Sequence, residues 1–243
     1  MSRRVRIQTL FLDAGGVLVF PNWQRVAVAL GRHGLVVDGA VLAAAEPRAK
    51  RELDAEFKGR LPAARPNGWA YFDLVLRHAG VPHSRAIDGA FAELRDYDAR
   101  WNLWEHVPAD VVPAVDRIRA LGLTLVVVSN TNGTLRALLH RVGLLSRLDL
   151  VVDSFEEGVE KPDPRLFRIA LEKAGARPES TVHVGDLYHV DVVGARGAGL
   201  RAVLLDCDDL YPDCDCPRVR TLGELADRVR DGSWHSSGQG PTG

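Results

Sequence analysis

The sequence predicts an α/β fold, with a parallel sheet as its core and a helical unit inserted after the first strand. From Pro108 onwards, short apolar runs alternate with amphipathic segments, which is the pattern of βαβ units and of a parallel sheet. Between Pro21 and Val107 the apolar residues instead recur at helical spacing. We therefore expect a core formed by residues 1–20 and 107–232 and a helical unit at 21–106. Residues 233–243 are expected to be a disordered tail.

The first strand is predicted at Ile7–Leu12, an apolar run that ends at Asp13 and the pair Gly15-Gly16 in a tight loop. In the helical unit, clusters of Gly, Pro and Asn at residues 59–62 and 65–68 are expected to separate helices. Most of the tryptophans fall in this unit, and we expect them in its core: Trp23, Trp69, Trp101 and Trp104.

Strands and helices then alternate along the remaining chain. Helices are expected at 111–121, 134–142, 164–174 and from Thr221, and strands at 123–128, 150–152, 181–184 and 202–205. A glycine follows each of the first three helices, as is typical of helix C-termini. Thr221 and Glu224 have the spacing of a capping box, which predicts the start of the last helix. The apolar strand at 123–128 is expected to be buried on both faces.

The composition is that of an ordinary globular protein, with 46% hydrophobic residues, 26% charged residues and a net charge of −1. This charge balance offers no field that would attract nucleic acid or an anionic membrane, so we expect neither partner. Residues 2–20 imitate a secretory leader, but the charge of Asp13 inside the apolar run argues against one.

The three cysteines, Cys207, Cys214 and Cys216, are too few and too close together for a disulfide framework. We expect reduced thiols in a surface loop and a reducing compartment, the cytoplasm. A structural zinc site is the alternative hypothesis. Such a site needs four nitrogen or sulfur ligands, and no nearby histidine supplies the fourth.

Chemically versatile side chains follow the predicted strands. In open parallel α/β sheets, ligands bind beyond the carboxyl ends of the strands. The side chains expected at that edge are Asp13, Ser129, Asn130, Lys161, Asp186 and Asp191. A nucleophilic carboxylate, a hydroxyl, a cation and an acidic pair suit phosphoryl transfer, because an anionic phosphoryl group needs positive charge around it. Oxygen ligands without histidine or cysteine favour Mg²⁺.

Four segments of the chain resemble the four motifs of the haloacid dehalogenase (HAD) superfamily, in the family's order. They are Leu12-Asp13-Ala14-Gly15-Gly16-Val17-Leu18, Val128-Ser129-Asn130-Thr131, Lys161-Pro162-Asp163-Pro164 and Val184-Gly185-Asp186 followed by Asp191 and Gly194-Ala195. The resemblance extends from Ile7 to about Leu205. It implies a HAD-like Rossmannoid parallel-sheet core with an inserted α-helical cap domain at 21–106.

The resemblance also implies catalytic roles. Asp13 is expected to attack phosphorus and become an aspartyl-phosphate, and Lys161 to pair with Asp13 and offset the negative charge there. Ser129 and Asn130 are expected to hold the phosphoryl oxygens of a small phosphorylated substrate.

A magnesium site follows from the same resemblance. Its expected ligands are the carboxylates of Asp13 and Asp186 and the backbone carbonyl of Gly15. Asp191 is expected next to the metal, either as a ligand or in contact with the ligands.

One position departs from the pattern of the family's phosphatases, which usually carry a second aspartate two residues after the nucleophile. Here that position is Gly15, so the group that protonates the leaving group is missing. A positioned general acid–base group contributes about 10²–10⁴-fold to a rate. A hydrolase without it would act on a good leaving group or take the proton from the cap, where the candidates are His33, His78, Glu52 and Glu56.

Three other functions stay open. The phosphonate-cleaving branch also lacks the second aspartate and uses a cap lysine, for which Lys50 and Lys58 are the candidates. The dehalogenase branch usually has threonine where this chain has Val17, and it lacks the Gly185-Asp186 pair, so it fits less well. A non-catalytic protein that binds phosphate ligands or partners is the third. The sequence favours a Mg²⁺-dependent phosphatase of a small metabolite.

Overall fold

The computed structural model describes residues 6–58 and 68–232. The chain divides into two compact units, Met1–Phe20 with Val107–Gly243 and Pro21–His106. The predicted disordered tail at 233–243 and nearly all of the predicted helix breakers lie outside the described residues.

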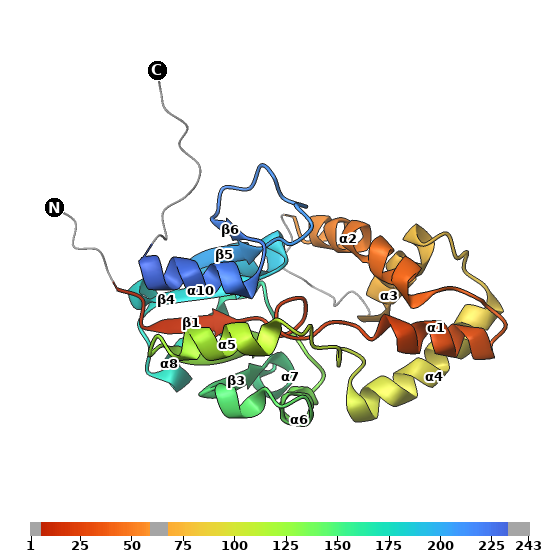
Figure 1. Cartoon of the computed structure of the whole chain (residues 1–243), viewed down its shortest axis with the longest axis horizontal. Helices are drawn as coiled ribbons and strands as arrows, with labels where there is room; N and C mark the ends of the chain where they lie inside the picture. Colours follow the sequence, from red (N-terminus) through yellow and green to blue (C-terminus); the bar gives the residue numbers. More distant parts are fainter. Residues whose placement is uncertain (1–5, 59–67, 233–243) are drawn as a thin grey trace, which may run out of the picture. The chain divides into compact units, whose positions relative to one another are not determined.

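A parallel sheet forms the centre of the first unit (Figure 1). The strands among the described residues are β1 Thr9–Leu12, β2 Thr124–Ser129, β3 Leu150–Asp153, β4 Thr181–Gly185, β5 Arg201–Leu205 and β6 Arg218–Val219. Their order is β3-β2-β1-β4-β5-β6, and every pair of neighbours is parallel. The predicted α/β fold with a parallel sheet is therefore confirmed.

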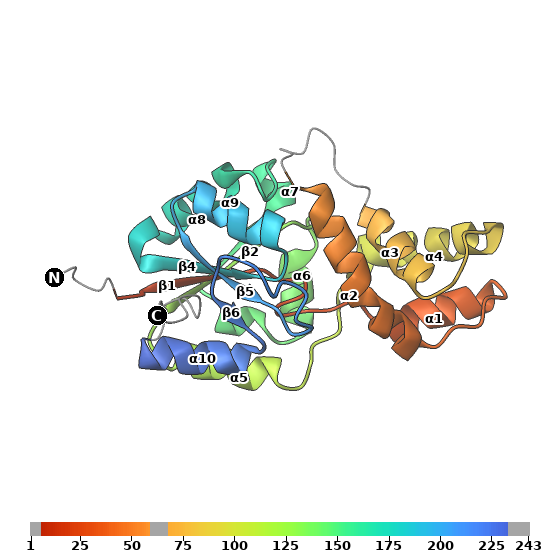
Figure 2. The same cartoon turned by 90° about the horizontal axis from the view of Figure 1, so that it is seen from above.

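Helices cover both faces of this sheet (Figure 2). Helices α5 Val111–Arg119 and α10 Leu222–Asp231 pack together on one face, and α8 Pro164–Ala174 and α9 Val193–Gly197 on the other. Side chains of the central strands that point to the second face, such as Phe11 and Val126, form one core cluster with Leu166 and Phe167 of α8. The alternation along the strands gives each face its own apolar layer.

Shorter helices complete this unit, and they shape the loops at the strand ends. They are α6 Leu135–Arg141, η1 Leu145–Arg147, α7 Ser154–Glu157, η2 Pro178–Ser180 and the π-helix η3 Tyr188–Val192. The π-helix begins three residues after the end of β4 and continues directly into α9. Its five residues therefore lie close to the carboxyl end of that strand. π-helical turns of this kind are frequent at functional sites.

Local sequence signals explain the ends of the longer helices. At the start of α8, the Asp163 side chain accepts a hydrogen bond from the backbone N–H of Arg165 at 2.9 Å, and Gly175 ends the helix with a φ of 59°. At the start of α10, the Thr221 hydroxyl accepts from the N–H of Glu224 at 3.0 Å. The Glu224 carboxylate returns to the N–H of Arg220 at 2.8 Å, one residue before the cap position.

The second unit consists of helices α1 Trp23–Arg32, α2 Gly39–Glu56, α3 Gly68–His78 and α4 Arg85–Trp101 among its described residues. It has an apolar core of its own, which includes Trp23. Trp69 and Trp104 pack against this core, but Trp101 is 51% exposed, so its predicted burial is wrong. Trp101 is the last residue of α4, where the turn faces solvent instead of the neighbouring helices.

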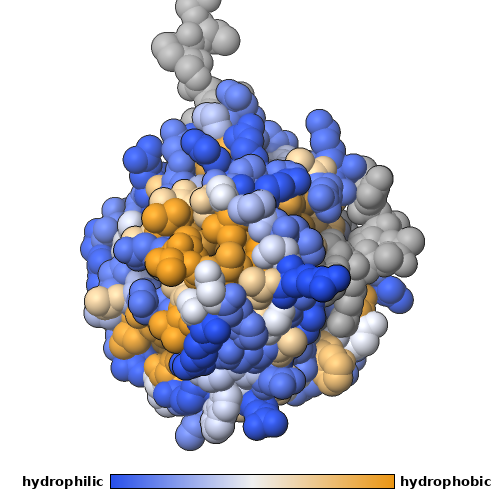
Figure 3. Space-filling model, turned by 90° about the vertical axis from the view of Figure 1, so that its right-hand side faces the viewer, coloured by the Kyte–Doolittle hydropathy of each residue, from blue (hydrophilic) through white to orange (hydrophobic). Residues whose placement is uncertain are grey.

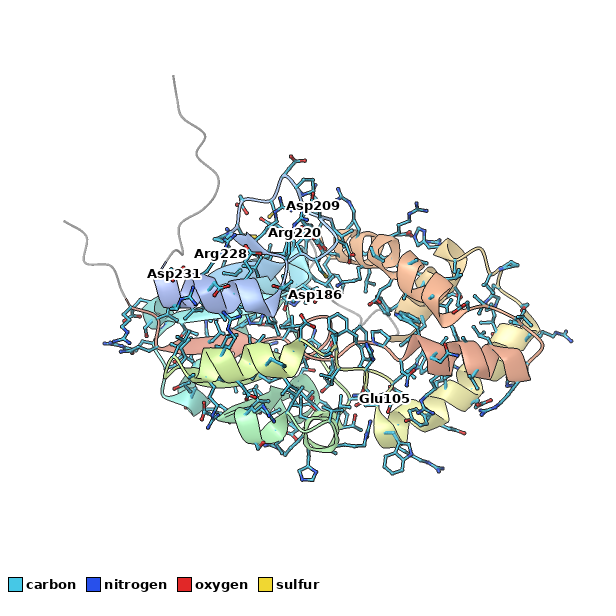
Figure 4. All side chains as sticks on the ribbon, viewed as in Figure 1. Glu105, Asp186, Asp209, Arg220, Arg228 and Asp231 are labelled. Atoms are coloured by element: carbon cyan, nitrogen blue, oxygen red, sulfur yellow. The ribbon has the colours of Figure 1, made fainter. Side chains whose placement is uncertain are left out.

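Half-buried carboxylates link the helices of this unit. Glu46 accepts hydrogen bonds from the Trp23 indole at 2.7 Å and the Tyr71 hydroxyl at 2.6 Å. Glu105, labelled in Figure 4, accepts from the side chains of Arg25 at 2.8 Å and Tyr97 at 2.8 Å. Burial alone would raise the pKa of Glu105, but these hydrogen bonds outweigh it and hold the pKa below its usual value.

Some apolar side chains remain on the surface, and Figure 3 shows apolar patches on the face that it draws. Those of the helical unit are Val28, Val36, Val41 and Trp101. Across residues 6–58 and 68–232, no helix combines the length and the apolar character needed to cross a membrane.

Candidate active site

The ends of two strands and the π-helix bring three predicted carboxylates together. Asp13 follows β1, Asp186 follows β4 (Figure 4), and Asp191 lies in η3. One oxygen of each carboxylate lies within 4.8 Å of the others, and all three residues are buried. Within the described part of the chain this is the one cluster of at least three His, Cys, Asp or Glu side chains with such spacing. Like charges this close need a cation.

Lys161 supplies a cation at this cluster. Its Nζ lies 2.8 Å from Asp13 Oδ2 and 2.7 Å from Asp191 Oδ1, and its side chain is 1% exposed. Burial lowers the pKa of Lys161, but the attraction of the two carboxylates and its hydrogen bonds to them prevail, so the pKa is raised. Lys161 therefore stays charged at neutral pH.

Asp13 is held by donors on three sides. Its Oδ1 accepts hydrogen bonds from the N–H of Ala14 at 2.7 Å and the Ser129 hydroxyl at 2.6 Å, and its Oδ2 faces Lys161. Burial raises the pKa of Asp13, and the negative charge of Asp191 adds to the rise, while Lys161 and Ser129 oppose it. The net pKa is above its usual value. The hydroxyl of Ser129 is thus within reach of any group bonded to Asp13.

Both oxygens of the Asp191 carboxylate accept hydrogen bonds. Its Oδ1 accepts from Lys161 Nζ and from His183 Nε2 at 3.0 Å, and its Oδ2 accepts from the N–H of Leu187 at 3.0 Å. Burial acts to raise the pKa of Asp191, but Lys161 and His183 lower it far below its usual value. Asp191 is therefore a fixed anion that orients Lys161.

His183 lies in β4, and 0% of its side chain is exposed. Its Nε2 donates to Asp191, whereas its Nδ1 is a buried atom with no hydrogen-bond partner among the described residues. No local sequence pattern indicates the contact with Asp191, because eight residues separate the two in the chain.

Asn130 contacts the backbone of Lys161. Its amide nitrogen donates to the Lys161 carbonyl at 2.9 Å, and its side-chain oxygen accepts from the Lys161 N–H at 2.8 Å. Both ends of the amide are thus engaged, and the side chain fixes the loop that carries Lys161.

The glycines of the first and fourth motifs allow close approach to the carboxylates. Gly15 is half-buried in the loop after Asp13. Gly16 has a φ of 70°, and a Cβ there would lie 1.9 Å from Asp186 Oδ2. A Cβ at Gly185 would lie 2.1 Å from the Asp191 carboxyl carbon. Both positions therefore require glycine if the two carboxylates are to stay where they are.

Gly16→Ala is expected to lower the free energy of unfolding by about 2–5 kcal/mol, because it combines a left-handed backbone with a collision at Asp186. Gly122→Ala is the matched control, since Gly122 has a φ of 76° and nothing within 4 Å of a Cβ. Only the backbone cost of about 1–2 kcal/mol should remain there. Thermal melts of both variants measure the difference. Equal losses would show that Asp186 moves aside without cost.

The candidate residues of the helical unit show their own pairings. Glu52 contacts Arg77, and its other oxygen lies 2.9 Å from His78 Nε2. His33 Nε2 lies 3.5 Å from Glu93. The remaining candidate acid, Glu56, is exposed at the end of α2, and of the two candidate lysines Lys50 is buried and Lys58 exposed.

The structure does not assemble a zinc site at the cysteines. All three are free thiols, and no metal-binding group among the described residues includes any of them. The expected placement in a surface loop holds for Cys207, which is exposed, but Cys216 is buried.

Comparisons with known proteins assign the chain to a family. Residues 7–199 match the family model of haloacid dehalogenase-like hydrolases. The chain is 30% identical over 213 residues to haloacid dehalogenase-like hydrolase domain-containing protein 3 of Mus musculus, covering 84% of each chain. It is 40% identical over 136 residues to a phosphoserine phosphatase of Thermus thermophilus, covering 56% of this chain and 53% of the relative.

Among solved structures, a HAD-hydrolase of Bacillus subtilis bound to magnesium has the same fold. Its TM-score is 0.67 at 18% identity, with 92% of this chain and 99% of that chain covered. The family model spans most of the sequence and includes all of the motifs that surround the buried carboxylates. This chain therefore belongs to the haloacid dehalogenase-like hydrolases and is a hydrolase.

Proposed function

We propose that this chain is a Mg²⁺-dependent phosphatase of a small phosphorylated metabolite and that Asp13 is its nucleophile. The observation that carries the proposal is the placement of Lys161, whose ammonium group lies between Asp13 and Asp191 at 2.8 and 2.7 Å. A buried carboxylate that pairs with a fixed cation is suited to attack an anionic group. The phosphatase name of the Thermus thermophilus relative supports the same reaction type.

In this proposal each residue of the site has a distinct role in the reaction. Asp13 attacks phosphorus and forms an aspartyl-phosphate, which water then hydrolyses. Lys161 offsets negative charge on Asp13 and on the phosphoryl group, and the Ser129 hydroxyl donates to a phosphoryl oxygen. Asp191 and Asn130 are positioning residues, because one fixes the ammonium group of Lys161 and the other its backbone.

The carboxylates fit a magnesium ion. Three buried carboxylate oxygens within 4.8 Å, with no nitrogen or sulfur donor in the group, form a hard oxygen site. Asp13 and Asp186 would hold the ion together with the Gly15 carbonyl. Asp191, the third carboxylate of the cluster, would lie beside the ion. When bound, the ion would neutralise phosphoryl charge.

The glycine at position 15 bears on which leaving groups the enzyme could release, because it has no carboxyl group to donate a proton. No carboxyl group stands two residues after Asp13, so the loop offers no proton to a departing alkoxide. We therefore infer that the chain prefers phosphate esters whose leaving group needs no protonation. The helical unit at 21–106 is proposed as the cap domain that selects among them. The proposed substrate is a small phosphorylated molecule. The proposed location is a reducing compartment, the cytoplasm, which fits three cysteines that form no disulfide.

The test compares leaving groups. Purified protein is assayed with nitrophenyl phosphate and with alkyl phosphates such as phosphoserine and glycerol phosphate, each with Mg²⁺ and with chelator. The proposal expects hydrolysis that requires Mg²⁺ and is faster for the aryl ester. Turnover of a haloacid without Mg²⁺ would point to a dehalogenase, and phosphate binding without turnover of any ester would point to a binding protein.

Gly15→Asp is expected to raise the rate on alkyl phosphates by about 10²–10⁴-fold, because it restores a group that protonates the leaving oxygen. The aryl ester should change much less, since its leaving group is stable as an anion. The measurement is kcat/KM for both substrates. Gly15→Asn is the matched control, which adds the same volume without an acid. If both variants fold and neither changes the turnover of alkyl phosphates, the missing aspartate does not limit their hydrolysis.

A further inference from the structure

The loop between β5 and β6, residues 206–217, contains all three cysteines of the chain. Cys214 Sγ and Cys216 Sγ lie 3.5 Å apart, so these two thiols are in direct contact. Cys216 is buried, Cys214 is half-buried and Cys207 is exposed. The buried Asp206 holds the loop, since it accepts from the N–H groups of Leu210 at 2.7 Å and Tyr211 at 3.1 Å. The thiol pair therefore sits on an ordered loop.

The residue between the two thiols connects this loop to the segment that carries the site. The Asp215 carboxylate accepts hydrogen bonds from the Tyr188 hydroxyl at 2.6 Å and from Arg196 Nη1 at 2.7 Å. Its backbone carbonyl accepts from Arg196 Nη2 at 2.9 Å. Tyr188 is the first residue of η3, which also carries Asp191, and Arg196 lies in α9 directly after it.

We propose that Cys214 and Cys216 form a reversible thiol modification site, which closes to a disulfide by exchange with a low-molecular-weight disulfide. The site uses none of the groups of the proposed reaction. The contact between the two sulfur atoms supports it, as does the absence of any further metal-binding side chain around the pair among the described residues. Disulfides in reducing compartments are usually transient and redox-sensing, which fits a pair of otherwise free thiols.

The exchange proceeds in two balanced steps. The Cys214 thiolate attacks one sulfur of the small disulfide, which forms a mixed disulfide and releases the first small thiol. Cys216 then attacks the Cys214 sulfur and releases the second small thiol, and the protons of both cysteines end on the released thiols. Cys214 attacks first because it is the more accessible of the two. Burial and the neighbouring Cys214 thiol raise the pKa of Cys216 to about 12, so Cys216 is the weaker nucleophile while both are reduced.

Closure changes the backbone at Asp215. The two sulfur atoms must approach from 3.5 Å to the bonding distance of about 2.05 Å across a single intervening residue. That movement alters the carboxylate and carbonyl of Asp215, which hold Tyr188 and Arg196. A strained disulfide of this kind is easily reduced, so the modification is reversible. Oxidation is therefore expected to loosen η3 and α9.

The first experiment measures the modification itself. The full chain is reduced, incubated with oxidised glutathione and mapped by mass spectrometry after alkylation. The expected product is a disulfide that joins Cys214 and Cys216, reversed by dithiothreitol and unchanged in Cys207→Ser. In Cys216→Ser the glutathione adduct should persist on Cys214, because no second thiol releases it. A stable adduct on wild-type Cys214, a disulfide that includes Cys207, or no reaction would overturn the proposal.

The second experiment measures the connection to the site without any activity assay. Hydrogen exchange is compared between the reduced and oxidised chain over residues 188–197. Loss of the Asp215 hydrogen bonds should speed exchange there about tenfold, and Cys216→Ser treated in the same way should show no such change. A disulfide that forms without faster exchange in this segment would refute the link between the loop and η3. Because neither readout is a rate of hydrolysis, failure here is distinct from failure of the proposed phosphatase.

Discussion

Asp13→Asn is expected to abolish the proposed phosphatase activity while the protein stays at least as stable. The amide keeps the shape of the carboxylate but is no nucleophile, so we expect kcat on nitrophenyl phosphate to fall by about 10⁴-fold or more. The pKa of Asp13 is raised, mainly by burial, so folding favours its protonated form. The ionised carboxylate therefore lowers the free energy of unfolding at neutral pH in the metal-free chain, and the neutral amide removes that cost.

Steady-state kinetics and thermal melts measure the two halves of this prediction. Asp153→Asn is the matched control, because Asp153 is also a buried aspartate at the end of a strand and pairs in register with Ser129. It lies outside the carboxylate cluster, so its amide variant should keep most of the activity. If the two variants lose activity equally, Asp13 has no special role. If Asp13→Asn melts well below the wild type, its charge stabilises the fold instead.

Lys161→Met is expected to damage both stability and activity. It leaves Asp13 and Asp191 buried near each other without their cation. Breaking a buried ion pair in this way costs about 3–5 kcal/mol, which lowers the melting temperature by about 6–20 °C in a protein of this size. The rate should also fall by at least about 10²-fold, because the phosphoryl group loses a positively charged donor.

Lys173→Met provides the control for Lys161→Met. Lys173 also pairs with a carboxylate, that of Glu157, but its side chain is 47% exposed. Exposed ion pairs contribute about 0–1 kcal/mol, so this variant should melt near the wild type and keep its rate. A Lys161→Met protein as stable and active as Lys173→Met would contradict the electrostatic account of the site.

Much of the fold was accessible from sequence because strong local signals mark it. The helix predicted at 164–174 is observed with the same bounds as α8, since Pro at its start and Gly after its end leave little freedom. The strands predicted from apolar runs agree with β1, β2 and β4, because both bounds of each lie within two residues of the observed ones. Their polar continuations, Asp13, Ser129 and Asp186, therefore meet at one sheet edge, as parallel strands require.

Features that depend on tertiary contacts were not accessible in the same way. Strand β6 has two residues, too few to show any periodicity. The clamp of Asn130 on the Lys161 backbone joins residues 31 positions apart, and nothing in the segment Ser129-Asn130 indicates it. The contact of Asp215 with Tyr188 likewise spans 27 positions. In each case the partner is chosen by the folded chain, so the residue type alone gives no pattern.

The most direct test of Asp13 as nucleophile is chemical trapping during turnover. Borohydride added to the enzyme with Mg²⁺ and an aryl phosphate reduces an aspartyl-phosphate to homoserine, and mass spectrometry then locates the change. The account predicts homoserine at position 13, only when substrate is present, and none in Asp13→Asn. A reduced adduct on Lys50 or Lys58, or steady hydrolysis with residue 13 unmodified, would contradict it.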